Sequence, residues 1–378
     1  MPPRVPFTQT FLSGKELEYV TRVIEQGSLA SDGPFSQQSA EWLKQYSGAA
    51  GVLMTSSCTA ALEMAAMLCE LGPGDEVIMP SFTFVSTASA VTRTGAQPVF
   101  VDIDRRTLNI DPACIAEQVN SRTRAIIPVH YAGVGCAMEA IGELAREHGL
   151  VVIEDAAQGV GAACGGRPLG AHGQLSTFSF HHTKNVACGE GGALCVNDES
   201  MLERARILRD KGTNRAAFLS GQVDKYSWVD EGSSYLPSEL ACAFLLAQLE
   251  AVEQINGARK QAYEFYHQQL EQLEEQGHIV RPHVPAECQT NHHLYHLLVA
   301  DREVRDQLLL ALNENGIHAV FHYVPLHLSP MGKRLAPATP TLPVTESSSE
   351  RILRLPLFAG ITTEQQQQVI AAIHDFFT

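Results

Sequence analysis

The sequence predicts an α/β protein in which helices cover both faces of a mainly parallel β-sheet, followed by a smaller α+β region. Between residues 50 and 200, short apolar runs rich in Val and Ile alternate with helical patterns. The runs are continuous rather than alternating in polarity, which is typical of strands covered on both faces. From about residue 239 the pattern changes to long helices with few strands, which indicates a second unit.

Each element follows from its local pattern. Seven strands are expected in the first unit, over residues 51–55, 76–80, 98–102, 124–128, 151–154, 176–180 and 192–196. A helix over 59–71 is expected to end at the Gly-Pro-Gly sequence of residues 72–74. In the second unit we expect a long helix from 239 towards 276, strands over 293–300 and 319–324, and helices over 302–313 and 363–376.

The length and charge of the chain limit its organisation and its partners. A chain of 378 residues exceeds one ordinary core, so we expect a large domain over 1–245 and a small C-terminal domain over 246–378. The N-terminal segment is free to pack on the small domain. The net charge of −15 argues against sequence-independent binding of nucleic acid, which needs a basic face.

The nine cysteines are scattered, and none of them has C-x-x-C spacing. We therefore expect reduced thiols without a disulfide or metal role, as in a cytoplasmic protein. Residues 2–6 lack the apolar core of a signal peptide, and no apolar run approaches the roughly 18 residues of a membrane span. The sequence predicts a cytoplasmic protein without a membrane partner.

Asp155 and Lys184 are the most informative residues. Asp155 follows the apolar strand pattern of residues 151–153, and Lys184 lies in a polar loop that precedes the glycine-rich segment 189–192. Pyridoxal 5'-phosphate (PLP) chemistry needs such a pair, because a lysine amine condenses with the aldehyde and a carboxylate keeps the pyridine nitrogen protonated. Taken singly, the aspartate is as consistent with a loop cap, and most lysines are solvated surface residues.

Further candidates for the cofactor site lie near strand ends. Ser57, Cys58 and Thr59 open a helix directly after a strand, where free amides suit a phosphate, and Ser179 is a second phosphate ligand. Of Phe82 and Phe84 we expect the first in the core and the second stacked on the pyridine ring. Gln158 is a candidate to contact the ring hydroxyl, and the alternative is that it caps a helix. His322 and His327 are candidates for substrate contacts, and the alternative is that they are polar residues at a strand edge. His181 and His182 point to opposite faces of an extended chain, so no metal site is expected.

These motifs, in this order, resemble the DegT/DnrJ/StrS family of sugar-nucleotide aminotransferases over nearly the whole chain. The matching segments are residues 33–34, 57–60, 80–84, 154–158, 179–184, 189–192 and 325–327. The resemblance implies the fold type I of PLP-dependent aminotransferases and a homodimer with active sites at the interface. It also implies Lys184 as the lysine that binds PLP, Asp155 as the partner of the pyridine nitrogen, and Phe84 as the stacking aromatic.

Residues 211–215, 221–226 and 232–236 resemble, within the family, the transaminases that make dTDP-4-amino-4,6-dideoxy-D-galactose for a cell-surface polysaccharide. The resemblance implies dTDP-4-keto-6-deoxy-D-glucose as substrate and L-glutamate as amino donor. Ser234 and Leu236 stand where many members carry Asn or Arg that reaches the partner's cofactor phosphate. The alternatives are amination at C3 or with gluco configuration, a sugar 3-dehydrase, in which histidine replaces the lysine, and a non-catalytic PLP-binding regulator.

Overall fold

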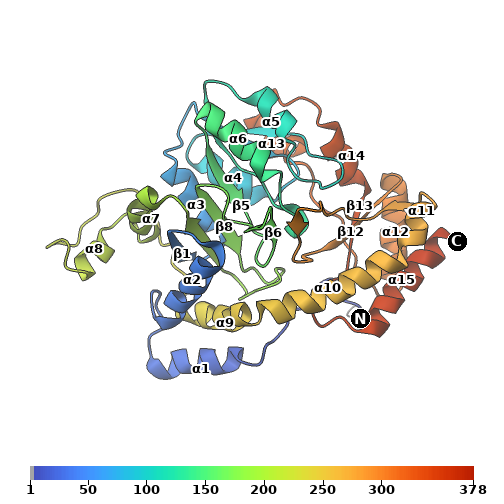
Figure 1. Ribbon diagram of the computed structural model, residues 1–378, viewed down its shortest axis with the longest axis horizontal. Helices are drawn as coiled ribbons and strands as arrows, with labels where there is room; N and C mark the ends of the chain where they lie inside the picture. Colours follow the sequence, from blue (N-terminus) through green and yellow to red (C-terminus); the bar gives the residue numbers. More distant parts are fainter. Residues whose placement is uncertain (1–3) are drawn as a thin grey trace.

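The structure, a computed structural model, describes residues 4–378 and is built around a seven-stranded sheet in the order β1-β9-β8-β5-β4-β2-β3 (Figure 1). β9 is antiparallel to β1 and β8, and the other neighbouring strands are parallel. The strands are β1 (Gly51–Thr55), β2 (Glu76–Pro80), β3 (Gln97–Val101), β4 (Thr123–Ile126), β5 (Val151–Asp155), β8 (Leu175–Ser179) and β9 (Gly192–Val196). The predicted mostly parallel α/β fold is confirmed.

Helices cover both faces of this sheet because neighbouring strand residues point in opposite directions. Val77 and Met79 pack under one group of helices, while Ile78 between them packs under the other. The helices over the first face are α3 (Cys58–Leu68), α4 (Val85–Arg93) and α7 (Leu202–Arg209). The second face is covered by α1 (Glu16–Gln26), α2 (Pro34–Ser47), α5 (Pro112–Gln118), α6 (Met138–His148) and α9 (Glu239–Glu250).

The C-terminal part forms a second core around a three-stranded antiparallel sheet. The strands are β10 (Ile279–Val280), β12 (Tyr295–Val299) and β13 (Ile352–Leu355). The helices in this part are α10 (Val252–Gln269), α11 (Glu271–Glu275), α12 (Arg302–Glu314), α13 (Pro330–Leu335), α14 (Pro343–Arg351) and α15 (Thr363–Phe377). Val5 is fully buried in this core, so the N-terminal segment packs on the C-terminal part of the chain.

The single long helix expected over 239–276 is wrong. It is divided into α9, α10 and α11, because Ala251 and Leu270 leave the helical region. Figure 1 shows α9 and α10 running one after the other from the large sheet towards the small sheet. The strand expected over 319–324 is also wrong, since only Val320 pairs, with Arg354 of β13, before the chain turns towards Pro325. The sequence prediction missed β13.

The prediction that all cysteines are reduced is wrong for two of them. Cys164 lies in β6 (Ala163–Cys164), which pairs with β7 (Arg167–Pro168) and with β11 (Cys288–Gln289). Antiparallel pairing puts Cys164 directly opposite Cys288, and the two form a disulfide. The other seven cysteines are free. None of the helices between residues 4 and 378 combines the length and apolar composition needed to cross a lipid bilayer.

One segment projects from the body of the molecule. It contains α8 (Arg215–Leu219) and extends away from the large sheet at the left of Figure 1. A bridge between Thr213 and Trp228 joins its two sides near the base. We call residues 213–229 the projecting arm.

Candidate active site

A cavity of about 650 Å³ lies at the carboxyl ends of β5 and β8, where open α/β sheets bind ligands. Asp155 and Lys184 both line it. So do all the other residues that the sequence suggested for the cofactor, namely Ser57, Cys58, Thr59, Phe84, Gln158 and Ser179. The structure therefore brings together residues from four separate segments of the chain.

Asp155 ends β5 with its carboxylate inside the cavity. One carboxylate oxygen accepts a hydrogen bond from Thr87 Oγ1 (2.8 Å), and the other accepts one from the backbone N–H of Ala157 (3.2 Å). Burial raises the pKa of Asp155 above its usual value, against the effect of these hydrogen bonds and of the Lys184 charge. A buried carboxylate with so few donors is suited to bind a cationic group in the cavity.

Lys184 reaches the same cavity from the loop after β8. Burial lowers the pKa of its amine, although the charge of Asp155 acts in the opposite direction. The loop is held by Val186 and Ala187, which are both buried, and Gly189 has a positive φ of 88° that favours glycine. The lysine thus has an amine with a reduced tendency to carry a proton, which makes it a better nucleophile.

The N-terminus of α3 forms another wall of the cavity. Ser57 caps the helix by accepting a hydrogen bond from the N–H of Ala60 (3.1 Å), and Thr59 Oγ1 contacts Ser86 Oγ (2.7 Å). The first amides of a helix lack intrahelical acceptors, and the helix dipole favours an anion there. Gly192 packs so closely against this turn that an added Cβ would lie 2.3 Å from the Ser57 carbonyl carbon. Ser57, Thr59 and the free amides could hold a phosphate.

The aromatic and amide candidates differ in burial. Phe82 is buried in the core (1% exposed), as predicted, whereas Phe84 is 58% exposed at the cavity wall with its ring 6.4 Å from that of Tyr323. Gln158 is fixed by its oxygen, which accepts a hydrogen bond from the N–H of Ala132 (2.7 Å). Phe84 is therefore free to stack on a planar ligand.

The two predicted substrate histidines are separated. His322 lines the cavity, and its Nδ1 lies 2.6 Å from the hydroxyl of Tyr131. His327 does not line the cavity, because its Nδ1 is bonded to Ser81 Oγ (2.7 Å) and its Nε2 contacts Glu346 (3.2 Å). Within residues 4–378 no group of three or more His, Cys, Asp or Glu side chains is arranged to hold a metal ion.

Sequence reasoning missed Arg354, which reaches the cavity from β13. Within residues 4–378 its Nε is buried without a hydrogen-bond partner, while one terminal nitrogen donates to the carbonyl of Phe321 (3.2 Å). Burial lowers the pKa of Arg354, and the side chains that act in the opposite direction are Tyr131 and Tyr323 rather than a carboxylate. The sequence signal that could have identified Arg354 is that it is the one charged residue in the otherwise apolar segment 352–357.

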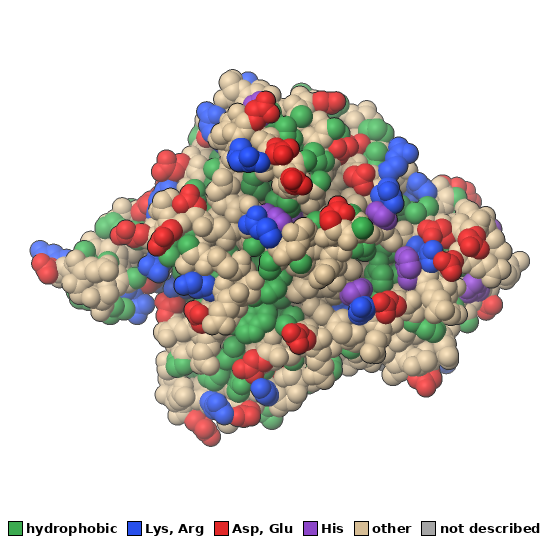
Figure 2. All heavy atoms as spheres, in the orientation of Figure 1, with side chains coloured by type: hydrophobic (Ala, Val, Ile, Leu, Met, Phe, Trp, Pro, Cys, Tyr) green, Lys and Arg blue, Asp and Glu red, His purple; other side chains and the backbone are tan. Residues whose placement is uncertain are grey.

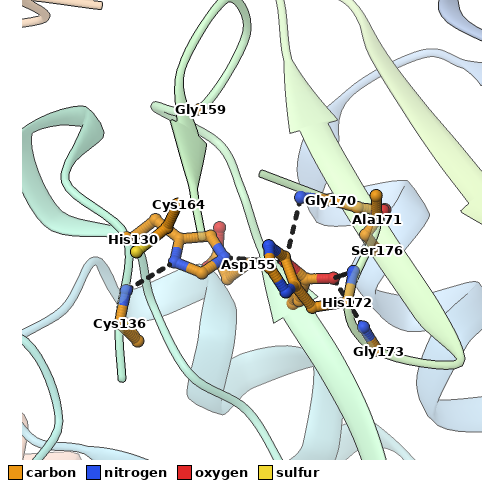
Figure 3. A network of polar contacts seen from close by, with 12 residues as sticks. His130, Cys136, Asp155, Gly159, Cys164, Gly170, Ala171, His172, Gly173 and Ser176 are labelled. Carbon is orange, nitrogen blue, oxygen red and sulfur yellow. Dashed lines mark hydrogen bonds and ion pairs between the residues drawn. The ribbon is translucent and has the colours of Figure 1, made fainter. Parts of the chain in front are cut away.

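Glu154, the neighbour of Asp155, lies on the other face of the sheet in a closed polar network. Its carboxylate contacts Nε2 of His130 (2.9 Å) and accepts hydrogen bonds from the N–H groups of Gly170 (2.9 Å), His172 (2.6 Å) and Gly173 (2.7 Å). Nδ1 of His130 accepts from the N–H of Cys136 (3.1 Å), which puts the ring proton at Nε2. Figure 3 shows how this network ties two loops to the end of β5 beside Asp155.

Fold and site define a PLP-dependent aminotransferase of fold type I, and comparison with known proteins identifies the family. Residues 11–374 match the DegT/DnrJ/EryC1/StrS aminotransferase family, to which the chain belongs. Among solved structures it is similar to DesV of S. venezuelae (32% identity, 100% of this chain and 99% of that chain covered, TM-score 0.90). It is also similar to the aminotransferase TlmJ from Streptoalloteichus hindustanus (30%, 99% and 98%, TM-score 0.90). A third similar structure is the PLP form of the sugar aminotransferase Spr1654 from Streptococcus pneumoniae (26%, 99% and 100%, TM-score 0.90).

The protein is therefore a PLP-dependent sugar aminotransferase. The residues in the cavity fit the cofactor. A lysine amine, a buried carboxylate, a helix N-terminus with two hydroxyl side chains and an exposed phenylalanine ring match the aldehyde, the ring nitrogen, the phosphate and the face of PLP. The volume of about 650 Å³ leaves room for a substrate beside it.

Proposed function

We propose that this enzyme transfers an amino group from L-glutamate to C4 of dTDP-4-keto-6-deoxy-D-glucose, giving dTDP-4-amino-4,6-dideoxy-D-galactose. The observation that carries the proposal is the presence of Lys184, Asp155 and the unpaired Arg354 in one cavity. PLP, when bound, supplies an aldehyde that takes up the amino group and a ring that accepts the electrons released at the donor carbon. The choice of sugar rests on the sequence resemblance of residues 211–236.

Lys184 has two roles in this proposal. Its amine would bind the cofactor aldehyde, and once an incoming amine has displaced it, the free amine would act as base and acid for the proton of the donor carbon. The lowered pKa of Lys184 supports both roles, because the neutral amine is the nucleophile and the base. Asp155 would keep the pyridine nitrogen of the bound cofactor in its protonated form.

Arg354 is the proposed anchor for a carboxylate of the amino donor. Its guanidinium contributes a buried, unsatisfied Nε, and a buried positive charge without a carboxylate partner is costly. A substrate carboxylate would supply the missing partner through a charge-assisted hydrogen bond. The carboxylate of an amino acid such as L-glutamate meets this need.

We further propose a cytoplasmic homodimer with active sites at the subunit interface. The projecting arm exposes large apolar side chains, among them Trp228 (80% exposed), Leu219 (67%) and Tyr226 (51%). Exposed apolar surface of this kind is typical of an interface. Tyr235, in the segment that follows the arm, contacts the turn that we propose binds the phosphate, since the N–H of Ser56 donates to its carbonyl (2.7 Å). A partner that packs on the arm and on the segment around Tyr235 would therefore lie near the cofactor phosphate.

The two half-reactions test the proposal separately. L-glutamate should bleach the yellow, borohydride-reducible chromophore of the PLP-loaded protein and release 2-oxoglutarate, and dTDP-4-keto-6-deoxy-D-glucose should restore the colour. NMR of the product should place an axial amine at C4. Lys184→Ala should lack the reducible chromophore. An unchanged spectrum with glutamate contradicts the donor and favours a regulator, and an amine at C3 or an equatorial amine contradicts the proposed sugar product.

Substitution of Arg354 tests the donor site. Arg354→Gln should weaken glutamate binding by about 10- to 100-fold in the first half-reaction, as expected for the loss of one charge-assisted contact. The second half-reaction should change little. Arg334→Gln, at an exposed arginine outside the cavity, is the control. If only the sugar half-reaction suffers, Arg354 binds the nucleotide phosphates instead.

A further inference from the structure

A second cavity, of about 680 Å³, lies between the large sheet and the small sheet, and no residue lines both it and the Lys184 cavity. Arg105 and Arg106 come from the loop after β3, and the other walls come from the C-terminal part of the chain. They include Arg281 after β10, His296 of β12 and Arg351 of α14. Figure 2 shows histidine, basic and acidic side chains around a hollow on the right of the drawn face, between the places of β12 and α11 in Figure 1. We call it the basic cavity.

The basic cavity carries positive charge that the protein does not neutralise. Of its four arginines only Arg281 makes ion pairs within residues 4–378, with Glu274 (2.6 Å) and Glu271 (3.5 Å). Arg106 contacts Nδ1 of His283 (3.1 Å), and Arg351 donates its Nε to the carbonyl of Val299 (2.6 Å). Arg105, Arg106 and Arg351 therefore make no ion pair within residues 4–378, and the carboxylate of Glu274, which also lines the cavity, is paired with Arg281.

His296 distinguishes this cavity from a group of solvated surface arginines. Its side chain lines the cavity although the residue is only 4% exposed, and its Nδ1 is buried without a hydrogen-bond partner. Burial lowers the pKa of His296 to about 3, so the ring is neutral at neutral pH and has one N–H to donate. A buried polar atom without a partner is costly, and a rotation of the ring towards the cavity would let a ligand supply the partner.

The N-terminus of α14 is not available to bind an anion in the basic cavity. Although Pro343 and Val344 line it, the N–H groups of Val344 and Thr345 already donate to the carboxylate of Asp102, at 3.0 and 2.7 Å. The free binding capacity thus belongs to the arginines and His296. Val280 and Leu298 add apolar surface beside them, which suits an organic group attached to the anion.

We propose that the basic cavity binds a small ligand that carries a pyrophosphate group. Planar guanidinium groups bind phosphate oxygens through paired hydrogen bonds, and three of them match the charge of a pyrophosphate better than that of a monoanion. Because Arg105 and Arg106 follow β3 of the large sheet and Arg351 precedes β13 of the small one, the ligand would tie the two parts together. This binding site is separate from the proposed transamination and does not depend on it.

The test uses the PLP-loaded protein with inorganic pyrophosphate and with a nucleoside diphosphate, each titrated by calorimetry. Both should bind, and Arg105→Gln with Arg106→Gln should weaken the binding by about tenfold or more. Arg105 and Arg106 are exposed, so the double variant should fold normally. Arg146→Gln with Arg334→Gln, two exposed arginines outside both cavities, is the matched control and should leave the binding unchanged.

His296→Phe provides an independent readout. It should weaken pyrophosphate binding without lowering the melting temperature of the ligand-free protein, because the imidazole Nδ1 has no partner to lose. If the nucleoside diphosphate binds more tightly than pyrophosphate, and the double variant loses this difference, the site is assigned to nucleotides. If the two bind equally, the site is assigned to free pyrophosphate. The proposal is overturned if neither probe binds, or if the Arg105→Gln/Arg106→Gln variant binds both as the unaltered protein does.

Discussion

Glu154 and Asp155 are neighbours in β5, yet they face two regions of opposite character. The carboxylate of Glu154 is closed in by His130 and three backbone amides, and these contacts outweigh burial and lower its pKa. The carboxylate of Asp155 has two donors and faces the cavity, and burial raises its pKa. A buried carboxylate whose oxygens are fully hydrogen-bonded stabilises the fold, whereas a buried carboxylate with few hydrogen bonds is available to a ligand.

The largest effect is expected from Asp155→Asn. The variant removes the charge that we propose keeps the cofactor nitrogen protonated, so the rate of transamination should fall by about 10³-fold, the size of a lost electrostatic contact in an active site. The fold should remain as stable, because the lost carboxylate is poorly compensated. The rate and the urea unfolding midpoint are measured together. A variant that loses stability but keeps its rate would reverse the roles assigned to the two faces.

Glu154→Gln should have the opposite profile. An amide cannot accept all the hydrogen bonds that the carboxylate accepts, so its NH2 would face N–H donors in a buried site. We expect the free energy of unfolding to fall by about 3 kcal/mol, as when one partner of a buried charged pair is removed. The rate of the folded protein should fall far less than in Asp155→Asn. Glu143→Gln, at an exposed position of α6, is the control.

Thr87→Val removes one hydrogen bond to Asp155 without removing the charge of its carboxylate. Thr87 donates to Asp155 Oδ2 (2.8 Å), and without this hydrogen bond the pKa of Asp155 should rise further. The loss of one hydrogen bond to a charged group is expected to cost about 1.5 kcal/mol, close to tenfold in rate. The acidic limb of the pH–rate profile should move to higher pH. Thr92→Val in the same helix should leave the profile in place, and a uniform loss of rate at every pH would point to altered packing instead.

The sequence predicted one side of this site much better than the other. The seven strands are visible as Val- and Ile-rich runs, so Asp155 and Ser179 could be placed at strand ends, and Lys184 follows in a short loop. Arg354 and His322 reach the cavity only because Val320 pairs with Arg354 across distant segments, which no local pattern reveals. The same limit applies to His327, which has the same residue type as His322 but bonds to Ser81 and Glu346 outside the cavity. Cys164 and Cys288, 124 positions apart, meet only through strand pairing.

The smallest expected effect is the pH dependence of stability in the cofactor-free protein, where the two carboxyl groups should act in opposite directions. The pKa of Glu154 is lowered from 4.5, so its stabilising contribution is present above pH 4.5 and is lost as the pH falls through the folded-state pKa. The pKa of Asp155 is raised from 3.8, so its contribution is fully present below pH 3.8 and is lost as the pH rises through the folded-state pKa.

Melting temperatures should therefore separate the two variants. The melting temperature of Glu154→Gln should approach that of the unaltered protein as the pH falls below 4.5. The melting temperature of Asp155→Asn should rise relative to that of the unaltered protein as the pH rises above 3.8. Added PLP should remove most of the advantage of Asp155→Asn, because a cationic ring nitrogen beside the carboxylate stabilises its ionised form. Parallel curves for the two variants would mean that both carboxylates are held in the same way, and the contrast between the faces of β5 would not stand.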